Sequence, residues 1–424
     1  MPESLRSQIQ KLEKRFGLPA KRCIAFVESN TSGTGRIFAS KAAEHGYLPV
    51  FLVEDPHRYP FLEQESLAFI HCQTRSLQAL LDTLGELSNE IAVAGVFSTS
   101  DYFLETAALL ARARGLSGAN PDALWAGRHK TVQRQNLRAA GFNTPEFICV
   151  DSIETAVAAG RAIGLPVVVK PTLESGSFGV RLCATLEEVA AHAGWLLQRT
   201  ANARGLPIPR EVLVEEYLVG PEYSAEAFAG RVRGITRKHL SPEPFFVELG
   251  HDFPAALPNG AFGQIVNLVE HALRELGLDW GPAHVEFRLH RQGPIIIEIN
   301  PRLAGGFIPE IVRLASGQDM IDDTICLLVG NPVKWAPQKT AHASIRFLTS
   351  PREGFITSIR GMAEARECKS IAEIQMYRCT GEQVRRENDF RDRIGHVIAC
   401  ADSPEAAARC AELACLKIRI EVEP

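Results

Sequence analysis

The chain has 424 residues, which is too long for one hydrophobic core, so two to four domains are expected. Acidic and basic side chains nearly balance, with a formal net charge of −4 and a sequence pI of about 6.3. This balance excludes the strongly basic surface of a nucleic-acid-binding or membrane-surface protein, and no apolar run is long enough to cross a membrane.

The N-terminal segment and the cysteines indicate a cytoplasmic protein. Residues 1–17 are charged and amphipathic, without the apolar stretch that a signal peptide needs. The ten cysteines are scattered, and none falls in the C-x-x-C spacing of metal and redox motifs. We therefore expect reduced and mostly buried thiols.

Strand and helix patterns alternate in the first part of the chain. Apolar runs typical of buried strands lie at residues 23–29, 47–55, 67–72 and 91–99, with helical stretches between them. This alternation predicts a parallel α/β sheet with crossover helices. We assign residues 1–125 to this N-terminal domain.

A glycine-containing loop follows a buried strand in the next part of the chain. Three valines lead into Lys170, and the loop from Glu174 to Gly179 is followed by another strand. Backbone N–H groups of such a loop bind phosphate oxygens, and a neighbouring lysine supplies a point charge. A merely flexible loop is the alternative, although a lysine without a partner on a buried strand is costly.

A second strand pattern, at residues 212–218, runs into a turn at Gly220-Pro221 and continues at 223–228. The edge of such a strand can present backbone donors and acceptors to a flat heterocycle, and Glu222 is placed to bind ribose hydroxyls. Solvent-facing charges fit the same pattern, so both interpretations stay open at this point.

The most informative stretch is a predicted hairpin near the three-quarter mark. Residues 283–289 and 294–300 read as two strands joined by a tight turn. Side chains alternate faces along a strand, so Glu298 and Asn300 share a face, and Glu286 lies beside Glu298 if the strands turn at 291–292.

Two carboxylates and an amide oxygen on one face are hard ligands that suit Mg²⁺ or Mn²⁺. Close like charges repel strongly unless a cation lies between them. Arg302, two residues beyond Asn300, adds a fork suited to phosphate or carboxylate. The alternative is a polar-faced strand pair with solvated glutamates.

Taken in order, these segments resemble the ATP-grasp superfamily over about residues 120 to 330. The resemblance implies an ATP-binding set formed by Lys130, Lys170, Ser175, Gly176, Ser177, Gly179, Glu215, Glu216, Tyr217, Leu218 and Glu222. It also implies metal ligands at Glu286, Glu298 and Asn300, with Glu298 bridging two Mg²⁺ or Mn²⁺ ions. Arg302 and Lys170 are the implied catalytic residues.

The segment Phe246–Pro254 is similar to the F-V-E-x-G-H-x-x-P stretch of bacterial L-amino-acid ligases of the bacilysin-synthetase type. This similarity implies a substrate site formed by Glu248, His251, Arg302, Gly305, Gly306 and Phe307. The charge of Glu248 suits an α-ammonium group. A solvated loop for Glu248 and a helix cap for His251 are the alternatives.

The resemblance implies a carboxylate–amine ligase that joins an amino acid, or a related acid, to an amino acid or amine. ATP would phosphorylate the carboxylate, giving an acyl phosphate and ADP, and the amine would then displace phosphate. A carboxylase-like enzyme activating bicarbonate, or a ligase of a non-amino carboxylic acid, is the alternative. The expected partners are small molecules, with no nucleic acid or membrane and with a homodimer left open.

The expected fold class is α/β plus α+β, with an ATP-grasp fold behind the N-terminal parallel domain. We assign 126–205 to the small part of the grasp, which covers the nucleotide, and 206–335 to the large part with the metal site. Beyond residue 335, short strand patterns and a closing helix predict an appended α+β subdomain over 336–424.

Overall fold

The computed structural model describes residues 5–17, 21–30, 34–202, 204–337 and 339–424. The chain divides into two compact units. Unit 1 comprises Met1–Trp125, Gly277–Pro282 and Asp319–Trp335, and unit 2 comprises Ala126–Leu276, Ala283–Gln318 and Ala336–Pro424. Both units use non-contiguous segments, so the four contiguous ranges given above stay a prediction.

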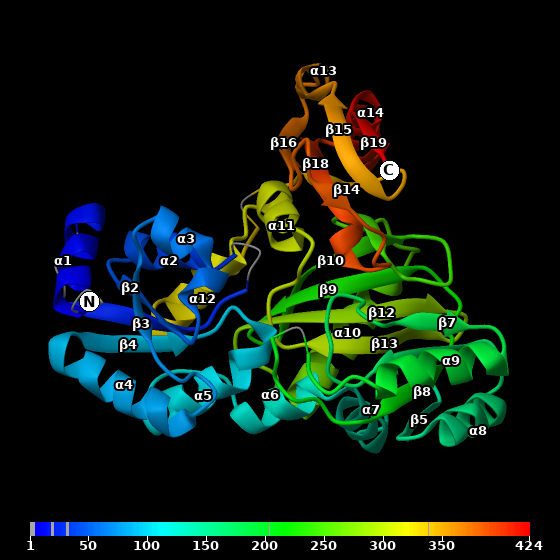
Figure 1. The fold of residues 1–424 in the computed structure, drawn as a ribbon, viewed down its shortest axis with the longest axis horizontal. Coiled ribbons are helices and arrows are strands. Elements are labelled where there is room, and N and C mark those ends of the chain that lie inside the picture. Colours follow the sequence, from blue (N-terminus) through cyan, green and yellow to red (C-terminus); the bar gives the residue numbers. More distant parts are fainter. Residues whose placement is uncertain (1–4, 18–20, 31–33, 203, 338) are drawn as a thin grey trace. The chain divides into compact units, whose positions relative to one another are not determined.

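Unit 1 is a parallel α/β sheet, as predicted (Figure 1). Its strand order is β3-β2-β1-β4, and every neighbouring pair is parallel. The strands β1 and β2 are almost fully buried, because helices cover both faces of such a sheet. The strands are β1 (Arg22–Val27), β2 (Leu48–Val53), β3 (Ala68–His71) and β4 (Ala92–Phe97). The helices are α1 (Leu5–Phe16), α2 (Thr34–Glu44), η1 (Pro56–Arg58), α3 (Pro60–Gln64), α4 (Leu77–Glu90), η2 (Asp101–Phe103), α5 (Leu104–Ala113) and α12 (Met320–Val329), and α6 (Pro121–Arg128) runs across the boundary to unit 2.

Unit 2 contains a four-stranded antiparallel sheet, here called the small sheet, with the order β5-β8-β6-β7. Helices α8 and α9 pack on it over a core that includes Val167, Val189 and Val214. Both helices begin with a capping box, at Ser152 and Thr185. The elements are β5 (Phe147–Val150), α8 (Ile153–Ile163), β6 (Val167–Pro171), β7 (Arg181–Cys183), α9 (Leu186–Leu197) and β8 (Val212–Glu216).

The second sheet of unit 2, here called the large sheet, has the order β13-β12-β9-β10-β11-β14-β18-β16. Its last three strands come from the C-terminal part of the chain, so this part extends the sheet as well as packing against it. The strands are β9 (Glu222–Phe228), β10 (Arg231–Leu240), β11 (Glu248–Phe253), β12 (Pro282–His290), β13 (Gly293–Asn300), β14 (His342–Thr349), β16 (Ile371–Met376) and β18 (Arg393–Ala401). Helices α10 (Ala261–Glu275), α11 (Ile308–Ser316) and α14 (Pro404–Lys417) pack against it.

Helix α7 (Lys130–Ala139) closes the exposed edge of the large sheet at β13. The Gln133 side chain donates to the carbonyl of Ile299 at 2.8 Å and accepts from its N–H at 2.9 Å, as a neighbouring strand would. Arg134 donates to the carbonyl of Ile297. Three backbone groups of the edge strand are therefore satisfied without another strand.

The C-terminal part also forms a three-stranded sheet of β17 (Gln383–Val384), β15 (Gly354–Arg360) and β19 (Arg419–Glu423), with α13 (Met362–Arg366) and η3 (Phe390–Asp392) nearby in sequence. A disulfide joins Cys368 to Cys410. The expectation of reduced thiols is wrong for this pair, because the packing of α13 on α14 brings together two cysteines that are 42 residues apart in sequence. The other eight cysteines are free thiols, and only Cys379 among them is exposed.

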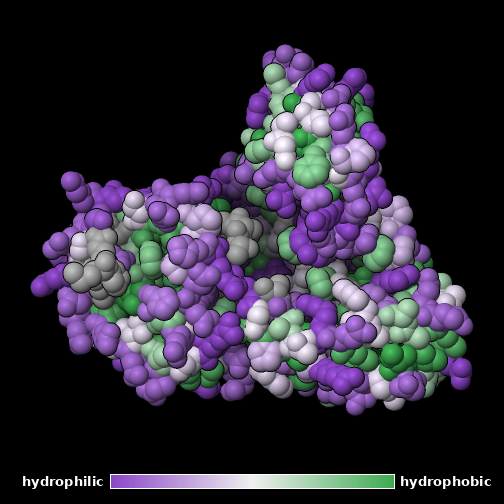
Figure 2. Space-filling view, viewed as in Figure 1, coloured by the Kyte–Doolittle hydropathy of each residue, from purple (hydrophilic) through white to green (hydrophobic). Residues whose placement is uncertain are grey.

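None of the helices in the described ranges is long and apolar enough to cross a membrane. The visible surface is mostly hydrophilic, with hydrophobic side chains gathered over the part of unit 2 that holds α8 and α9 (Figure 2). Ile153 and Trp195 are among the exposed hydrophobic residues there.

Candidate active site

The predicted hairpin is formed by β12 and β13, and its register pairs Glu286 with Glu298 and His284 with Asn300. The expectation that the two glutamates lie side by side is confirmed. Each carboxylate holds a different ammonium group: Glu286 lies 3.1 Å from Lys238 Nζ, and Glu298 lies 3.0 Å from Lys130 Nζ. Positive charge thus already compensates two acids that would otherwise repel each other.

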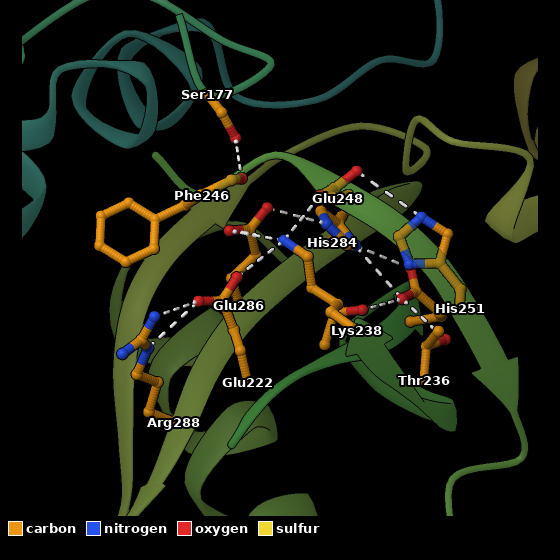
Figure 3. A network of polar contacts seen from close by, with 12 residues as sticks. Ser177, Glu222, Thr236, Lys238, Phe246, Glu248, His251, His284, Glu286 and Arg288 are labelled. Carbon is orange, nitrogen blue, oxygen red and sulfur yellow. Dashed lines mark hydrogen bonds and ion pairs between the residues drawn. The ribbon is translucent and has the colours of Figure 1, made fainter. Parts of the chain in front are cut away.

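Lys238 on β10 is the centre of the network drawn in Figure 3, and the sequence analysis missed it. Its buried Nζ lies 3.1 Å from Glu222, 2.8 Å from Glu248 and 3.1 Å from Glu286. Burial alone would disfavour the ammonium, but the three carboxylates outweigh it and raise the pKa of Lys238 well above its usual value. Nothing local in the sequence marks Lys238, which follows Arg237 on the same strand.

His284 links Glu286 to a fourth carboxylate, Glu226, which the sequence analysis also missed. Its Nδ1 lies 3.0 Å from Glu226, and its Nε2 lies 3.1 Å from Glu286. Burial would lower the pKa of His284, but the two glutamates raise it to about 9. The imidazole is therefore protonated near neutral pH and holds Glu286 in place.

The donor set at the hairpin fits a hard divalent cation. Glu286 and Glu298 lie opposite each other, and Asn300 follows Glu298 on the same face of β13. In this structure the ammonium groups of Lys238 and Lys130 lie beside the two carboxylates, where a divalent cation would also be attracted. Burial would raise the pKa of Glu286, but Lys238 and His284 hold it far below its usual value, so its carboxylate is ionised and able to ligate.

A second buried ion cluster lies on the small sheet. Glu215 on β8 receives Lys170 from β6 on one oxygen and Arg134 from α7 on the other, with Nε of Arg134 at 2.7 Å. Burial lowers the pKa of Lys170, and Glu215 and Glu298 oppose that shift. The Glu215 side chain therefore positions Lys170, and contact with a nucleotide base would fall to the backbone of this segment.

The remaining predicted ATP-binding residues lie around these clusters. Glu216 is exposed and accepts from the backbone N–H of Glu146, and the Tyr217 hydroxyl donates to Glu243. Arg288, another residue that the sequence analysis missed, donates to the carbonyl of Leu218 at 2.8 Å and to Glu222 at 3.1 Å.

The glycine-containing loop bends through left-handed backbone conformations at Gly176, Ser177 and Gly179. Ser177 donates to the carbonyl of Phe246 at 3.2 Å (Figure 3). Lys130 donates to the carbonyl of Glu174 at 2.5 Å. The Ser175 carbonyl accepts from Phe178 at 3.4 Å within the loop. These contacts hold the loop between Lys130 and the segment before β11.

Glu248 and His251 lie on β11, so neither the loop nor the helix-cap alternative holds. They are three residues apart, which would place them on opposite faces of a regular strand. A β-bulge in β11 brings them to the same face. Glu248 lies three residues before His251, but its partner Leu240 lies only two residues after Lys238, the partner of His251. Glu248 consequently lies 3.6 Å from His251, on the same side (Figure 3).

Both oxygens of Glu248 are already paired. Lys238 holds Oε1 at 2.8 Å, and Arg393 on β18 holds Oε2 at 2.6 Å. Burial would raise the pKa of Glu248, but the two cations keep it well below its usual value. Burial also lowers the pKa of His251 to about 3, so this imidazole is neutral.

The glycines after Arg302 pack against this group. A Cβ on Gly306 would lie 2.6 Å from His251 Nε2, whereas a Cβ on Gly305 would meet open space. Phe307 has a left-handed backbone and its ring lies 4.3 Å from that of His396. Arg302 donates to the carbonyl of Leu303 at 2.8 Å.

Comparison with known proteins places these clusters in a family. Residues 163–310 match the ATP-grasp domain, and residues 346–423 match the L-amino acid ligase C-terminal domain 2. The uncharacterized protein y4rH of Sinorhizobium fredii is 33% identical over 423 residues, covering 100% of this chain and 86% of that protein. Alanine–anticapsin ligase of Bacillus amyloliquefaciens is 25% identical over 274 residues, which are 59% of this chain and 57% of the ligase.

Among solved structures, the L-amino acid ligase from Bacillus licheniformis superposes with a TM-score of 0.78 at 20% identity, covering 95% of this chain and 99% of that one. This likeness confirms the fold. The chain therefore belongs to the ATP-grasp superfamily and carries the C-terminal domain of its L-amino acid ligases.

Proposed function

We propose that the protein is an ATP-dependent carboxylate–amine ligase that joins an amino acid, or a related carboxylic acid, to an amino acid or amine. One observation carries the proposal: Glu286 of the β12–β13 hairpin and Glu248, which lies beside His251, share the single lysine Lys238. In this proposal Glu286 would serve the phosphoryl groups and Glu248 the substrate, and both residues lie on the large sheet. The matches to alanine–anticapsin ligase and to the C-terminal ligase domain support the same activity.

The chemistry follows from the weakness of a carboxylate as an electrophile. A carboxylate oxygen attacks the γ-phosphorus of ATP, the bond to the bridging oxygen breaks, and ADP leaves with the electron pair. The amine then attacks the acyl carbon, loses a proton, and releases inorganic phosphate. Such phosphoryl transfer requires positioning and charge compensation, and it needs no nucleophilic side chain.

The charged residues of the site divide between the two substrates. Lys130 and Lys170 would contact ATP phosphates, beside the loop at residues 175–179. Arg302 would stabilise the transferring phosphate and the new acyl phosphate. Glu286, Glu298 and Asn300 would hold Mg²⁺ or Mn²⁺, with two ions expected, and such ions neutralise charge on the phosphate oxygens.

Lys238 is expected to act at the junction. If a bound cation compensated Glu286, the Lys238 ammonium would still have Glu222 and Glu248 as partners. We infer that Lys238 orients both carboxylates and compensates their negative charge in the buried interior. Glu222, on the nucleotide side, would then bind ribose hydroxyls.

A phosphate-release screen of the purified protein tests the proposal. MgATP is offered with all pairs of the twenty amino acids and with related amines, and products are identified by mass spectrometry. We expect ADP and phosphate in a 1:1 ratio with an amide product. AMP and pyrophosphate as the stoichiometric products would contradict the acyl-phosphate route, and bicarbonate-dependent ADP release without an amide would contradict ligation.

A further inference from the structure

A group of three side chains joins helix α2 to helix α12 within unit 1. His45 lies directly after the end of α2, and Asp322 and Cys326 lie on α12. The two helices pack against each other (Figure 1), although His45 and Cys326 are 281 residues apart in sequence. None of the three residues belongs to the candidate active site described above, whose residues lie in unit 2.

One ring nitrogen of His45 faces both of the other residues. Its Nε2 lies 2.8 Å from Oδ1 of Asp322 and 3.9 Å from Sγ of Cys326, and the three atoms all lie within 4.8 Å of one another. Asp322 and Cys326 are four residues apart on one helix, so both project from the same face. Ligand atoms around a tetrahedral Zn²⁺ ion lie about 3–4 Å apart, so small side-chain rotations would admit the ion.

The donor atoms of this group differ from those of the β12–β13 hairpin. They are an imidazole nitrogen, a thiol sulfur and a carboxylate oxygen, and the first two favour Zn²⁺ over Mg²⁺, which prefers oxygen ligands. Cys326 is buried, whereas the side chains of His45 and Asp322 are 23% and 22% exposed. Three protein ligands thus line one side of the site, and water can reach the fourth position from the other.

A lysine next to the group is held mainly by other carboxylates. The Nζ of Lys41 lies 4.0 Å from Asp322, but it lies 2.8 Å from Glu44 and 3.5 Å from Asp319. The Asp322 carboxylate therefore has His45 as its closer partner. A simple hydrogen bond between Asp322 and His45 would use two of the three residues, whereas a metal ion would use all of them.

We propose that His45, Asp322 and Cys326 bind Zn²⁺, which fastens α12 to α2. On binding, the thiol of Cys326 loses its proton to solvent, the thiolate and the other two side chains ligate the ion, and water completes the coordination. The role is structural, because the ion would tie residues 319–335 to the N-terminal part of unit 1. This inference does not depend on the proposed ligase function.

Cobalt is the probe, because Co²⁺ replaces Zn²⁺ in such sites and absorbs strongly in the near ultraviolet when a thiolate is bound to it. The full-length protein is freed of metal with a chelator and titrated with Co²⁺ under argon. We expect this absorption to saturate at one ion per chain and to disappear when Zn²⁺ is added. Cobalt held only by the oxygen ligands of the hairpin gives no thiolate absorption, so the signal requires a cysteine.

Cys326→Ser should abolish this absorption. His45→Gln and Asp322→Asn should weaken Zn²⁺ affinity by about 100-fold or more, because even partners outside the ligand shell contribute about 10- to 100-fold. These two positions are partly exposed, so their variants guard against a folding defect in Cys326→Ser. Cys415→Ser, at a partly buried thiol of α14, and His271→Gln, at an exposed histidine of α10, are the matched controls and should keep the wild-type titration.

Zn²⁺ should also raise the thermal unfolding midpoint of the wild type but not that of His45→Gln, because the ion binds the folded arrangement. A wild type without thiolate absorption, or an undiminished absorption in Cys326→Ser, would overturn the proposal and leave a hydrogen-bonded pair beside a buried thiol. Unchanged Zn²⁺ affinity in both His45→Gln and Asp322→Asn would overturn it as well. These measurements use no ATP, so the ligase function stands or falls separately, by ADP release.

Discussion

At the scale of single residues, the active-site prediction depends most on Glu298. Glu298→Gln preserves size and shape but removes one of the two carboxylate charges that face each other across the hairpin. We expect a folded protein whose ADP release falls by about 100-fold or more, because charge compensation at the phosphates carries most of the catalysis. Circular dichroism and a phosphate-release assay measure the two properties.

The matched control is Glu275→Gln, at an exposed glutamate of α10 that pairs with the exposed His271. It should behave as the wild type in both measurements. Near-normal turnover in Glu298→Gln would remove the metal-ligand assignment of this residue.

Lys238 matters for stability as well as for activity. Lys238→Met has a similar length but leaves Glu222, Glu248 and Glu286 without their shared cation in a buried environment. Removing one partner of a buried ion pair costs about 3–5 kcal/mol, so we expect a marked loss of unfolding free energy in chemical denaturation. Metal binding would offset only the Glu286 part of that loss.

Arg237 gives the comparison for this variant, because it is the preceding residue on β10 and is exposed. Arg237→Met should change the unfolding free energy by less than about 0.5 kcal/mol. Equal destabilisation by the two substitutions would mean that the three-carboxylate contact contributes nothing specific.

Residue types were the part of the site that the sequence could predict. Glu286 and Glu298 followed from strand alternation, because both lie on apolar strands with an evident turn. The ion pairs of Glu248 could not be predicted in this way. Its partner cations, Lys238 and Arg393, are 10 and 145 residues away in sequence, and nothing local marks them. In the sequence Lys238 follows Arg237 and looks like one more surface charge.

At the scale of elements, strand β18 contains a buried histidine, His396, whose titration should change the stability of the protein with pH. Burial lowers the pKa of His396 to about 4, whereas an unfolded histidine has a pKa of about 6.5. Between these values the unfolded chain binds more protons than the folded one, so stability falls as the pH falls from about 6.5 to 4. The full effect of this one group is up to about 3 kcal/mol.

His396→Gln removes this titration while keeping a hydrogen-bonding group opposite the Tyr377 hydroxyl, which lies 2.7 Å from His396 Nδ1. Denaturation midpoints measured from pH 7 to 4 should decline less steeply in the variant. His271→Gln, at an exposed histidine, should keep the wild-type slope. Parallel curves for His396→Gln and the wild type would contradict a buried neutral His396.

Strand positions were more predictable than their irregularities. Apolar runs located β1 and β2 because both faces of these strands are buried. Shorter apolar runs located β6 and β13. The bulge in β11 was not predicted, although Gly250, which follows Leu249 inside the strand, is a residue type that often marks one. That one extra residue is what turns Glu248 toward His251.

At the scale of the molecule, the two units depend on segments that return from far along the chain. Helix α12 packs on β4, where a Cβ on Gly95 would lie 3.4 Å from Leu328. The return of residues 319–335 to unit 1 could not be predicted locally, because its apolar pattern fits a helix in either unit. Contacts between distant segments decide the assignment.

A fragment of residues 1–125 should therefore not fold alone. It lacks α12, which covers part of its sheet, and the missing helix would expose apolar surface on β4 and α2. We expect poor dispersion in a ¹H–¹⁵N spectrum, and addition of a peptide of residues 317–336 should improve it. A well-dispersed spectrum of the fragment by itself would contradict this dependence.

The continuity of the large sheet limits where the sequences of two related proteins can be recombined. The region that matches the ligase C-terminal domain begins at residue 346, in the middle of β14. β14 is hydrogen-bonded to β11, so a recombination crossover at residue 346 would take the two strands of this ladder from different parents. Recombination between relatives should therefore succeed only when β11 and β14 are inherited from the same parent, so that their shared ladder stays intact.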